Sequence, residues 1–272
     1  MNSGKPHPPL ATPNNHGTQR VILLGASNLS RGFPTIVHLL RQGLAGPLDI
    51  AVAMGHGRSY GTWSRWLGRA LPGINHCGLW PYLANQSLKQ PAPLAAIMDL
   101  GNDLVYGVDA KTLLGWLDTT LQRLRAMGCD VVMLSLPMES LDRLTSARFE
   151  ITRRLIFPGH PMGWPELHRQ ITQLDEGMRG LARQHGVHWI ESPGHWFGMD
   201  PIHIRRSLQA EAWQTLFGHW PVWKTPAEDT PPALWQPFEL RMLQPAERRL
   251  FGMQQRAAQP ALSTPGFRIS LF

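Results

Sequence analysis

Three polar side chains in this 272-residue sequence could together perform nucleophilic catalysis: Ser27, Asp200 and His203. A serine hydroxyl is a weak nucleophile at neutral pH, so it needs a base within about 3 Å and an acid that holds this base in one tautomer. Asp200 and His203 are three positions apart, which places both side chains on one side of a loop or first helical turn. These residue types therefore predict acyl transfer through a serine, a histidine and an aspartate.

The sequence also offers donors for the negative charge that such a reaction creates. Attack on an ester carbonyl produces an oxyanion, which preorganised N–H groups must meet. Three donors are candidates: the Ser27 backbone N–H, the Asn102 side-chain amide, and a backbone N–H in the turn at residues 55–57. We assign the third donor to Gly57, because a residue without Cβ lets the backbone approach a substrate closely.

Apolar runs that precede these residues predict the elements that must position them. We expect strands at 21–24, 49–54, 94–100, 131–136 and 187–190, separated by helices at 35–42, 62–71, 111–127 and 165–185. Because parallel neighbours need crossover connections, this alternation predicts an α/β protein, a three-layer α/β/α sandwich around a five-stranded parallel sheet. In the flavodoxin-like order 2-1-3-4-5, the ends of the first and third strands flank the ligand crevice, so Ser27 and Asn102 would lie side by side.

The order of these motifs resembles that of the SGNH/GDSL hydrolases over residues 20–220. That family has a serine after the first strand, a glycine after the second, Asn-Asp after the third and Asp-x-x-His near the end. The matching positions here are Ser27, Gly57, Asn102 with Asp103, and Asp200 with His203. The resemblance implies a serine esterase with the nucleophile Ser27, the base His203, its partner Asp200, and an oxyanion hole of Ser27, Gly57 and Asn102.

Two alternatives stay open at this point. Residues 57–61 match the Gly-x-Ser-x-Gly nucleophile elbow of α/β-hydrolases, which would make Ser59 the nucleophile, although only one predicted strand precedes this turn and its helix. The other alternative is a non-catalytic protein of the same fold that only binds a ligand, because Ala26 and Asn28 stand where the family usually has aspartate and leucine. In the esterase hypothesis, the residues that line the substrate pocket are Asn28, Arg58, Ser59 and Trp164.

Composition narrows the choice of partners. The net charge of +7 comes with only 17% charged residues spread over several segments, which favours a solvated basic surface over a nucleic-acid site. The sequence has no P-loop and no His-Glu-x-x-His, so we expect no cofactor and no metal.

The sequence has two cysteines, no apolar run of about 18 residues and no signal peptide. These features favour a cytoplasmic protein without a membrane span. We expect a small-molecule or carbohydrate ester as substrate, with pocket shape deciding the acyl group, for example acetyl.

Segment composition suggests how the chain is organised. We expect a flexible start at 1–18 and a hydrolase domain at 19–220, in which an insertion at 137–164 forms a lid over the site. Residues 221–272 are rich in Pro and Trp and predict an arm, including a basic helix at 238–253. Such an arm would dock on the core or on a second copy in a homo-oligomer.

Overall fold

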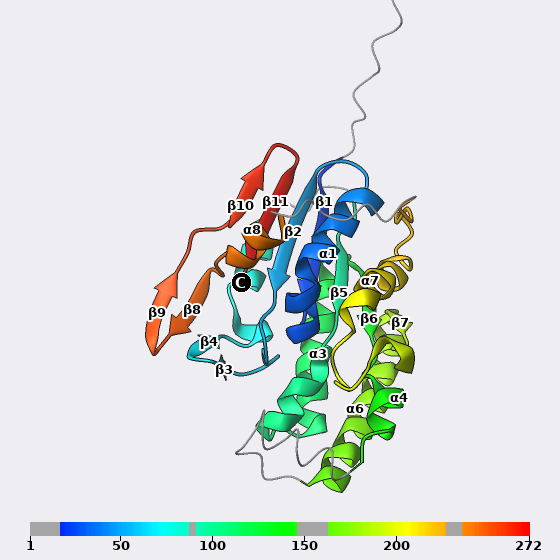
Figure 1. Cartoon of the computed structure of the whole chain (residues 1–272). Coiled ribbons are helices and arrows are strands. Elements are labelled where there is room, and N and C mark those ends of the chain that lie inside the picture. The colour runs from blue at the N-terminus through cyan, green and yellow to red at the C-terminus, as the bar shows by residue number, and fades with distance from the viewer. Residues whose placement is uncertain (1–16, 87–90, 146–162, 227–235) are drawn as a thin grey trace, which may run out of the picture.

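The computed structural model describes residues 17–86, 91–145, 163–226 and 236–272. Its main sheet has seven strands in the order β10-β11-β2-β1-β5-β6-β7 (Figure 1). The strands are β1 (Gln19–Leu24), β2 (Leu48–Ala53), β5 (Leu94–Ile97), β6 (Asp130–Leu134), β7 (His188–Ile190), β10 (Leu262–Thr264) and β11 (Phe267–Leu271). All neighbours are parallel except β10, which is antiparallel to β11.

The predicted architecture is confirmed, but the predicted strand count is wrong. The five expected strands are consecutive in the sheet, in the expected order 2-1-3-4-5, and β7 forms one edge. Two strands from the C-terminal segment extend the sheet beyond β2, where β11 pairs with β2 in parallel. The segment at 221–272 therefore contributes directly to the main sheet, because the apolar residues of β11 complete the core beside β2.

Helices cover both faces of the main sheet (Figure 1). Alternate residues of β1 point to opposite faces, so Ile22 and Leu24 join one apolar cluster and Val21 and Leu23 the other. The first cluster includes α3 (Ala110–Ala126) and α6 (Trp164–His185), and the second includes α1 (Ser27–Gly43) and α7 (Gln209–Phe217). These two cores on either side of the sheet make the three layers.

A second, antiparallel sheet has the order β3-β4-β8-β9. Its strands are β3 (Ser64–Trp66), β4 (Arg69–Leu71), β8 (Glu247–Leu250) and β9 (Met253–Arg256). The predicted helices at 62–71 and 238–253 are therefore wrong: the first is a hairpin, and α8 covers only Gln236–Met242 before β8 begins. Each hairpin turns through two residues with positive φ, of which the second is Gly68 or Gly252. This geometry is typical of type I′ turns. Gly68 and Gly252 are the residues in the sequence that indicate these turns, but the helical spacing of the apolar residues around them favoured a helix.

The remaining described elements are short. They are the helices α2 (Leu79–Ala84) and α4 (Met138–Asp142) and the 3-10 helices Ile74–His76, Leu100–Tyr106, Gly194–Trp196 and Arg206–Leu208. Most of the predicted flexible start and of the predicted lid at 137–164 lies outside the described residues, at 1–16 and 146–162. Among the described helices, none combines the length and the apolar character that crossing a bilayer requires.

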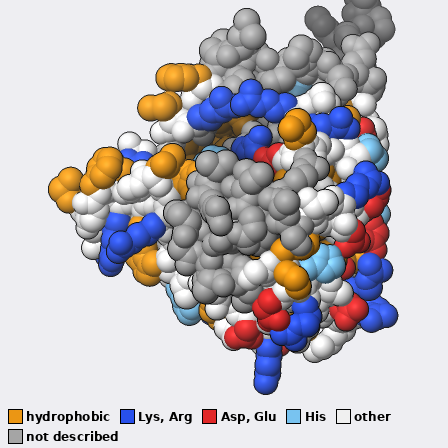
Figure 2. All heavy atoms as spheres, turned by 60° about the horizontal axis from the view of Figure 1, so that its bottom comes forward, with side chains coloured by type: hydrophobic (Ala, Val, Ile, Leu, Met, Phe, Trp, Pro, Cys, Tyr) orange, Lys and Arg blue, Asp and Glu red, His pale blue; other side chains and the backbone are white. Residues whose placement is uncertain are grey.

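Charged side chains of both signs share the surface drawn in Figure 2. Basic and acidic groups are interspersed along its right-hand and lower edges.

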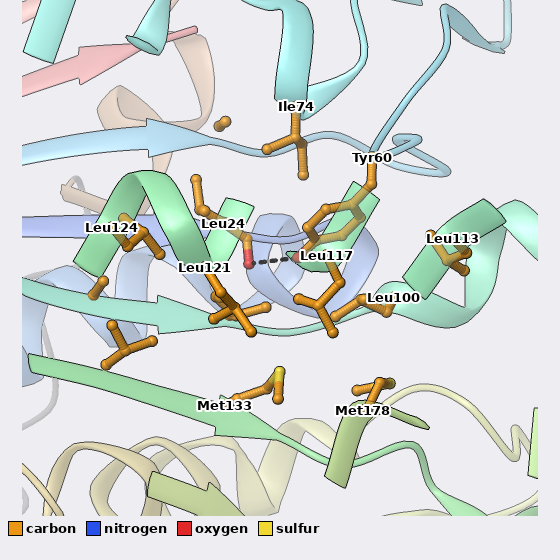
Figure 3. Packing of buried hydrophobic residues seen from close by; sticks show 14 of the residues in the cluster. Leu24, Tyr60, Ile74, Leu100, Leu113, Leu117, Leu121, Leu124, Met133 and Met178 are labelled. Carbon is orange, nitrogen blue, oxygen red and sulfur yellow. Dashed lines mark hydrogen bonds between the residues drawn. The ribbon is translucent and has the colours of Figure 1, made fainter. Parts of the chain in front are cut away.

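Tyr60 ties the loop after β2 to the centre of the sheet. Its ring is fully buried and packs near Leu24, Ile74 and Leu117 (Figure 3). The hydroxyl group lies 3.3 Å from the main-chain oxygen of Leu24 and 2.9 Å from that of Met98. Burial raises the pKa of this phenol, so the hydroxyl stays protonated and can donate to these carbonyl groups. The loop after β2 is thereby held beside the carboxyl ends of β1 and β5.

Candidate active site

The structure brings Ser27, His203 and Asp200 together at the carboxyl end of β1. The Ser27 Oγ lies 2.9 Å from Nε2 of His203, and Nδ1 of His203 lies 2.6 Å from Oδ2 of Asp200. Ser27 is the first residue of α1, while Asp200 and His203 come from the loop before α7. The other carboxylate oxygen of Asp200 accepts the Ile202 and His203 amides at 3.3 and 3.2 Å. One loop therefore holds both the acid and the imidazole.

The environment of Asp200 keeps this carboxyl ionised. Burial alone would raise the pKa of Asp200, but the hydrogen bond and the charge of His203, the Ile202 amide and the Arg31 guanidinium lower it below its usual value. Arg31 lies 3.6 Å from the carboxylate. An ionised Asp200 fixes the proton of His203 on Nδ1 and leaves Nε2 free to accept from a serine hydroxyl.

A carboxylate from the next strand along the sheet, Asp99, starts helix α1. Its Oδ2 accepts the amides of Ala26, Asn28 and Leu29 at 2.8, 3.0 and 3.2 Å. Because these amides would otherwise lack partners, Asp99 replaces a side-chain N-cap, and the helix begins at Ser27 rather than at the predicted residue 35. Asp99 does not accept the N–H of Ser27, which makes no hydrogen bond within the described chain.

Two further donors flank Ser27. The Asn102 Nδ2 is buried and has no hydrogen-bond partner among the described residues. Gly57 has φ +63°, and a Cβ there would meet the Tyr106 hydroxyl at 2.4 Å, so glycine is required. That hydroxyl donates to the Gly57 main-chain oxygen at 2.7 Å and holds the turn. The three predicted donors all belong to residues that line one hollow with Ser27 and His203.

The Asn28 amide group is engaged in hydrogen bonds within the fold, although the residue also lies in the lining of a pocket beside Ser27. Its Nδ2 donates to Asp99 Oδ1 at 2.7 Å and to the Ile202 main-chain oxygen at 2.9 Å, and its Oδ1 accepts the Ile204 amide at 2.9 Å. These contacts hold the residues on both sides of His203. Asn28 is therefore a positioning residue for the imidazole, in the position where the SGNH pattern has leucine.

We expect Asn28→Leu to lower kcat about 10- to 100-fold with little change in KM, because a loosened His203 no longer meets Ser27 in line. Asn75→Leu is the matched control, since Asn75 is a buried asparagine that bonds Trp116 and Thr120 away from the site. Both variants should lose about 1–3 kcal/mol of unfolding free energy by leaving buried groups unpaired, but only Asn28→Leu should lose kcat. Equal kcat losses in the two variants would assign Asn28 a purely structural role.

Arg58 and Ser59 line neither of the two pockets at Ser27, which corrects two predicted pocket residues. Both are fully buried. The Arg58 guanidinium donates to the main-chain oxygens of Pro72, Met54 and Phe272. The Ser59 hydroxyl donates to Asp103 and accepts the Gly61 and Thr62 amides at 3.1 and 2.9 Å. Ser59 therefore bonds a carboxylate and two amides inside the fold, and no imidazole of the described residues forms a hydrogen bond with it.

Asp103 anchors the loop after β2 rather than taking part in the triad. Besides the Ser59 hydroxyl it accepts the Tyr60 amide at 3.0 Å. Burial raises its pKa from 3.8 to about 6, although both hydrogen bonds act in the opposite direction. The bond between Asp103 and Ser59 joins residues 44 positions apart, so no local pattern in the sequence indicates it.

The raised pKa of Asp103 predicts how stability depends on pH. Between pH 3.8 and about 6 the folded protein holds a proton that an unfolded aspartate has lost, so this residue's contribution to unfolding free energy falls as pH rises through that window. We expect a decrease of about 3 kcal/mol in the wild type that is missing in Asp103→Asn. Urea unfolding at pH 4, 5, 6 and 7 measures the difference, and identical pH profiles for the two proteins would contradict it.

Two hollows meet at Ser27. One, of about 670 Å³, contains Ser27, Asn102 and His203 in its lining, and we call it the basic hollow for the arginines that it also contains. The other, of about 440 Å³, shares Ser27 and Asn102, and we call it the apolar hollow. Trp164 lies in the lining of the apolar hollow, where the sequence predicted that it contacts substrate. Both volumes lie in the range of small-molecule sites.

Five of the described histidines each pair with a single carboxylate: His168, His185, His188, His195 and His203. His185 lies 2.6 Å from Asp118, and His188 lies 3.2 Å from Asp130, so the two histidines of the His-x-x-His stretch diverge. In the part of the chain that the structure describes, no three His, Cys, Asp or Glu side chains converge as metal ligands would.

No family model matches this chain, and no curated protein matches it. Among solved structures it is similar to TesA, with 18% identity and a TM-score of 0.46 over 74% of this chain and 97% of that one. It is also similar to a lipolytic protein of the G-D-S-L family from Veillonella parvula, with 13% identity and a TM-score of 0.47 over 75% and 100% of the two chains. A third is AlinE4, described as an SGNH-hydrolase family esterase, with 14% identity and a TM-score of 0.40 over 83% and 93%.

Proposed function

We propose that the protein is a carboxylic ester hydrolase in which Ser27 is the nucleophile, His203 the general base and Asp200 the partner of the imidazole. The observation that supports this function best is the continuous contact from Ser27 Oγ through the imidazole to the carboxylate, at 2.9 and 2.6 Å. This contact lies where two hollows of ligand size meet. A serine that only capped a helix would need neither the imidazole nor the hollows.

The proposed reaction has two steps. Ser27 Oγ attacks the ester carbonyl while His203 Nε2 takes the hydroxyl proton, and His203 then gives this proton to the departing alcohol oxygen. Water next attacks the acyl-serine while His203 takes a proton from it, and His203 then returns this proton to Ser27 Oγ as the acid leaves. The oxyanion of each step would be met by the Ser27 amide, the Gly57 amide and the Asn102 side chain. The unpartnered Nδ2 of Asn102 supports this role, because a buried donor without a partner costs about 1–3 kcal/mol unless a ligand uses it.

A fluorophosphonate probe tests the nucleophile on the unaltered protein. Such a probe bonds covalently to an activated serine and should label the folded protein but not the heat-denatured protein. Trypsin then separates the candidates, because Ser27 lies in the peptide at 21–31 and Ser59 in the peptide at 59–65. We expect the label on 21–31, with fragmentation placing it on Ser27 rather than on Ser30. Label on 59–65 would favour the nucleophile elbow, and a folded but unlabelled protein would favour the non-catalytic alternative.

A further inference from the structure

The two hollows that meet at Ser27 differ in charge. The lining of the basic hollow contains Arg31, His56, Arg69, Arg206 and Arg241, and no described residue in this lining is Asp or Glu. Apolar side chains dominate the other hollow, among them those of Leu136, Leu144, Leu167, Ile171, Phe197 and Trp164. The two ends of a substrate that spans Ser27 would therefore meet opposite environments.

Three of these arginines have no counter-ion in the described part of the chain. Arg31 lies 3.6 Å from Asp200, but Arg69, Arg206 and Arg241 form no ion pair with any described carboxylate. Arg69 lies on β4 and is half-buried, Arg206 opens the 3-10 helix before α7, and Arg241 lies on α8. Three separate elements thus bring unpaired cations to one hollow, an arrangement that attracts anions.

His56 lies in the same lining, and the positive charges there affect its pKa. Burial lowers the pKa of His56, and the charges of Arg69, His203 and Arg31 lower it further. Asp99 acts in the opposite direction as the weakest of these influences. Besides burial, the charges that act most on His56 are therefore the cationic groups of the basic hollow.

The position of His203 decides which end of an ester enters which hollow. His203 lines the basic hollow and is not among the residues that line the apolar one. The imidazole must protonate the leaving oxygen, so the alcohol has to lie on the side where the imidazole is accessible. The alcohol then occupies the basic hollow, and the acyl chain occupies the apolar hollow.

We propose that this site acts on esters that join an apolar acyl group to an alcohol carrying a negative charge, such as a phosphate, sulfate or carboxylate group. This inference rests on the proposed function, because it divides the substrate at the carbonyl that Ser27 attacks. The reaction stays a hydrolysis, in which water enters, the acid and the anionic alcohol leave, and the arginines take no proton.

Two matched esters test the proposal: the hexanoate ester of 4-hydroxybenzenesulfonate and that of its neutral analogue, 4-hydroxybenzenesulfonamide. We expect the wild type to hydrolyse the sulfonate ester with kcat/KM about tenfold higher, since each exposed arginine contributes about threefold. The double variant Arg206→Gln/Arg241→Gln should bring the ratio near one, chiefly by lowering kcat/KM for the sulfonate ester. Both side chains are exposed and unpaired in the described chain, so folding should not change.

The control variant Arg169→Gln/Arg183→Gln removes the same charge from exposed positions on α6 that line neither hollow, and it should keep the tenfold ratio. A third ester places the carboxylate at the acyl end, as the adipic acid monoester of the sulfonamide phenol. It should be the poorest substrate. A preference for it would place the anion on the acyl side and overturn the assignment.

Calorimetric binding of both hexanoate esters to Ser27→Ala separates the two ways of failing. Tighter binding of the sulfonate ester that depends on Arg206 and Arg241, without hydrolysis by the wild type, would reject the proposed function and keep anion recognition. Hydrolysis of both esters with a ratio near one, together with equal binding, would keep the proposed function and reject anion recognition.

Discussion

Replacing Ser27 with alanine is expected to lower kcat for ester hydrolysis by about 10⁶-fold, the loss typical of removing the nucleophile from a serine, histidine and aspartate triad. The residual rate would come from the oxyanion donors and substrate binding, which the substitution leaves in place. Folding should be intact, because the hydroxyl contributes no cap to α1 and, among the described residues, bonds only His203. Initial rates on the sulfonate hexanoate ester measure the effect, with thermal unfolding as the check on folding.

Thr119→Ala is the matched control for this prediction. Thr119 lies on α3 and lines neither hollow, and its hydroxyl donates to the Gly115 main-chain oxygen at 2.9 Å. Its loss should change kcat less than threefold, as expected for one modest intrahelical hydrogen bond. If Ser27→Ala kept a tenth or more of the wild-type rate, Ser27 would not be the nucleophile.

Asp200→Asn is expected to lower kcat by about 10³-fold, because an asparagine amide no longer holds the His203 proton on Nδ1 and no longer stabilises the imidazolium. The expected loss is below the roughly 10⁴-fold of a buried triad aspartate, since the Asp200 side chain is 51% exposed and water partly replaces it. KM should change little, because the carboxylate contacts the imidazole and not the reacting ester. Full pH profiles of kcat for both proteins provide the measurement.

Asp118→Asn tests whether any carboxylate and imidazole pair would give the same result. Asp118 lies 2.6 Å from His185, the same separation as in the triad, but between α3 and α6 and without a serine. This variant should keep the wild-type kcat. A loss of tenfold or less in Asp200→Asn would show that His203 acts without its carboxylate partner.

Local patterns predicted the central sheet because strand formation depends on short apolar runs and on the breaks between them. Parallel crossovers then bring the carboxyl ends of the strands to one edge, so Ser27 and Asn102 could be expected near each other. The pair Asp200 and His203 could be expected on one loop because three positions separate them. Each of these inferences needs only neighbouring residues and a general rule of topology.

The errors fall where long-range pairing overrides local periodicity. The segment at 62–71 has helical spacing, but β4 pairs with β8 from the other end of the chain, which stabilises a hairpin instead. Ser59 matches a nucleophile elbow, yet its hydroxyl group donates a hydrogen bond to Asp103 inside the core. Asp99 starts helix α1 from 73 positions away, and no local pattern marks it as a cap.

The sequence by itself determined the layered sheet and the residue types that could carry out acyl transfer, because both depend on short-range order along the chain. Only the tertiary structure decided which serine contacts an imidazole and which polar residues form hydrogen bonds inside the fold. It also decided how two hollows of unlike charge meet at Ser27. The physical reason is that hydrogen bonds and electrostatic fields act through space, and the serine and imidazole that they join here lie 176 positions apart in the chain.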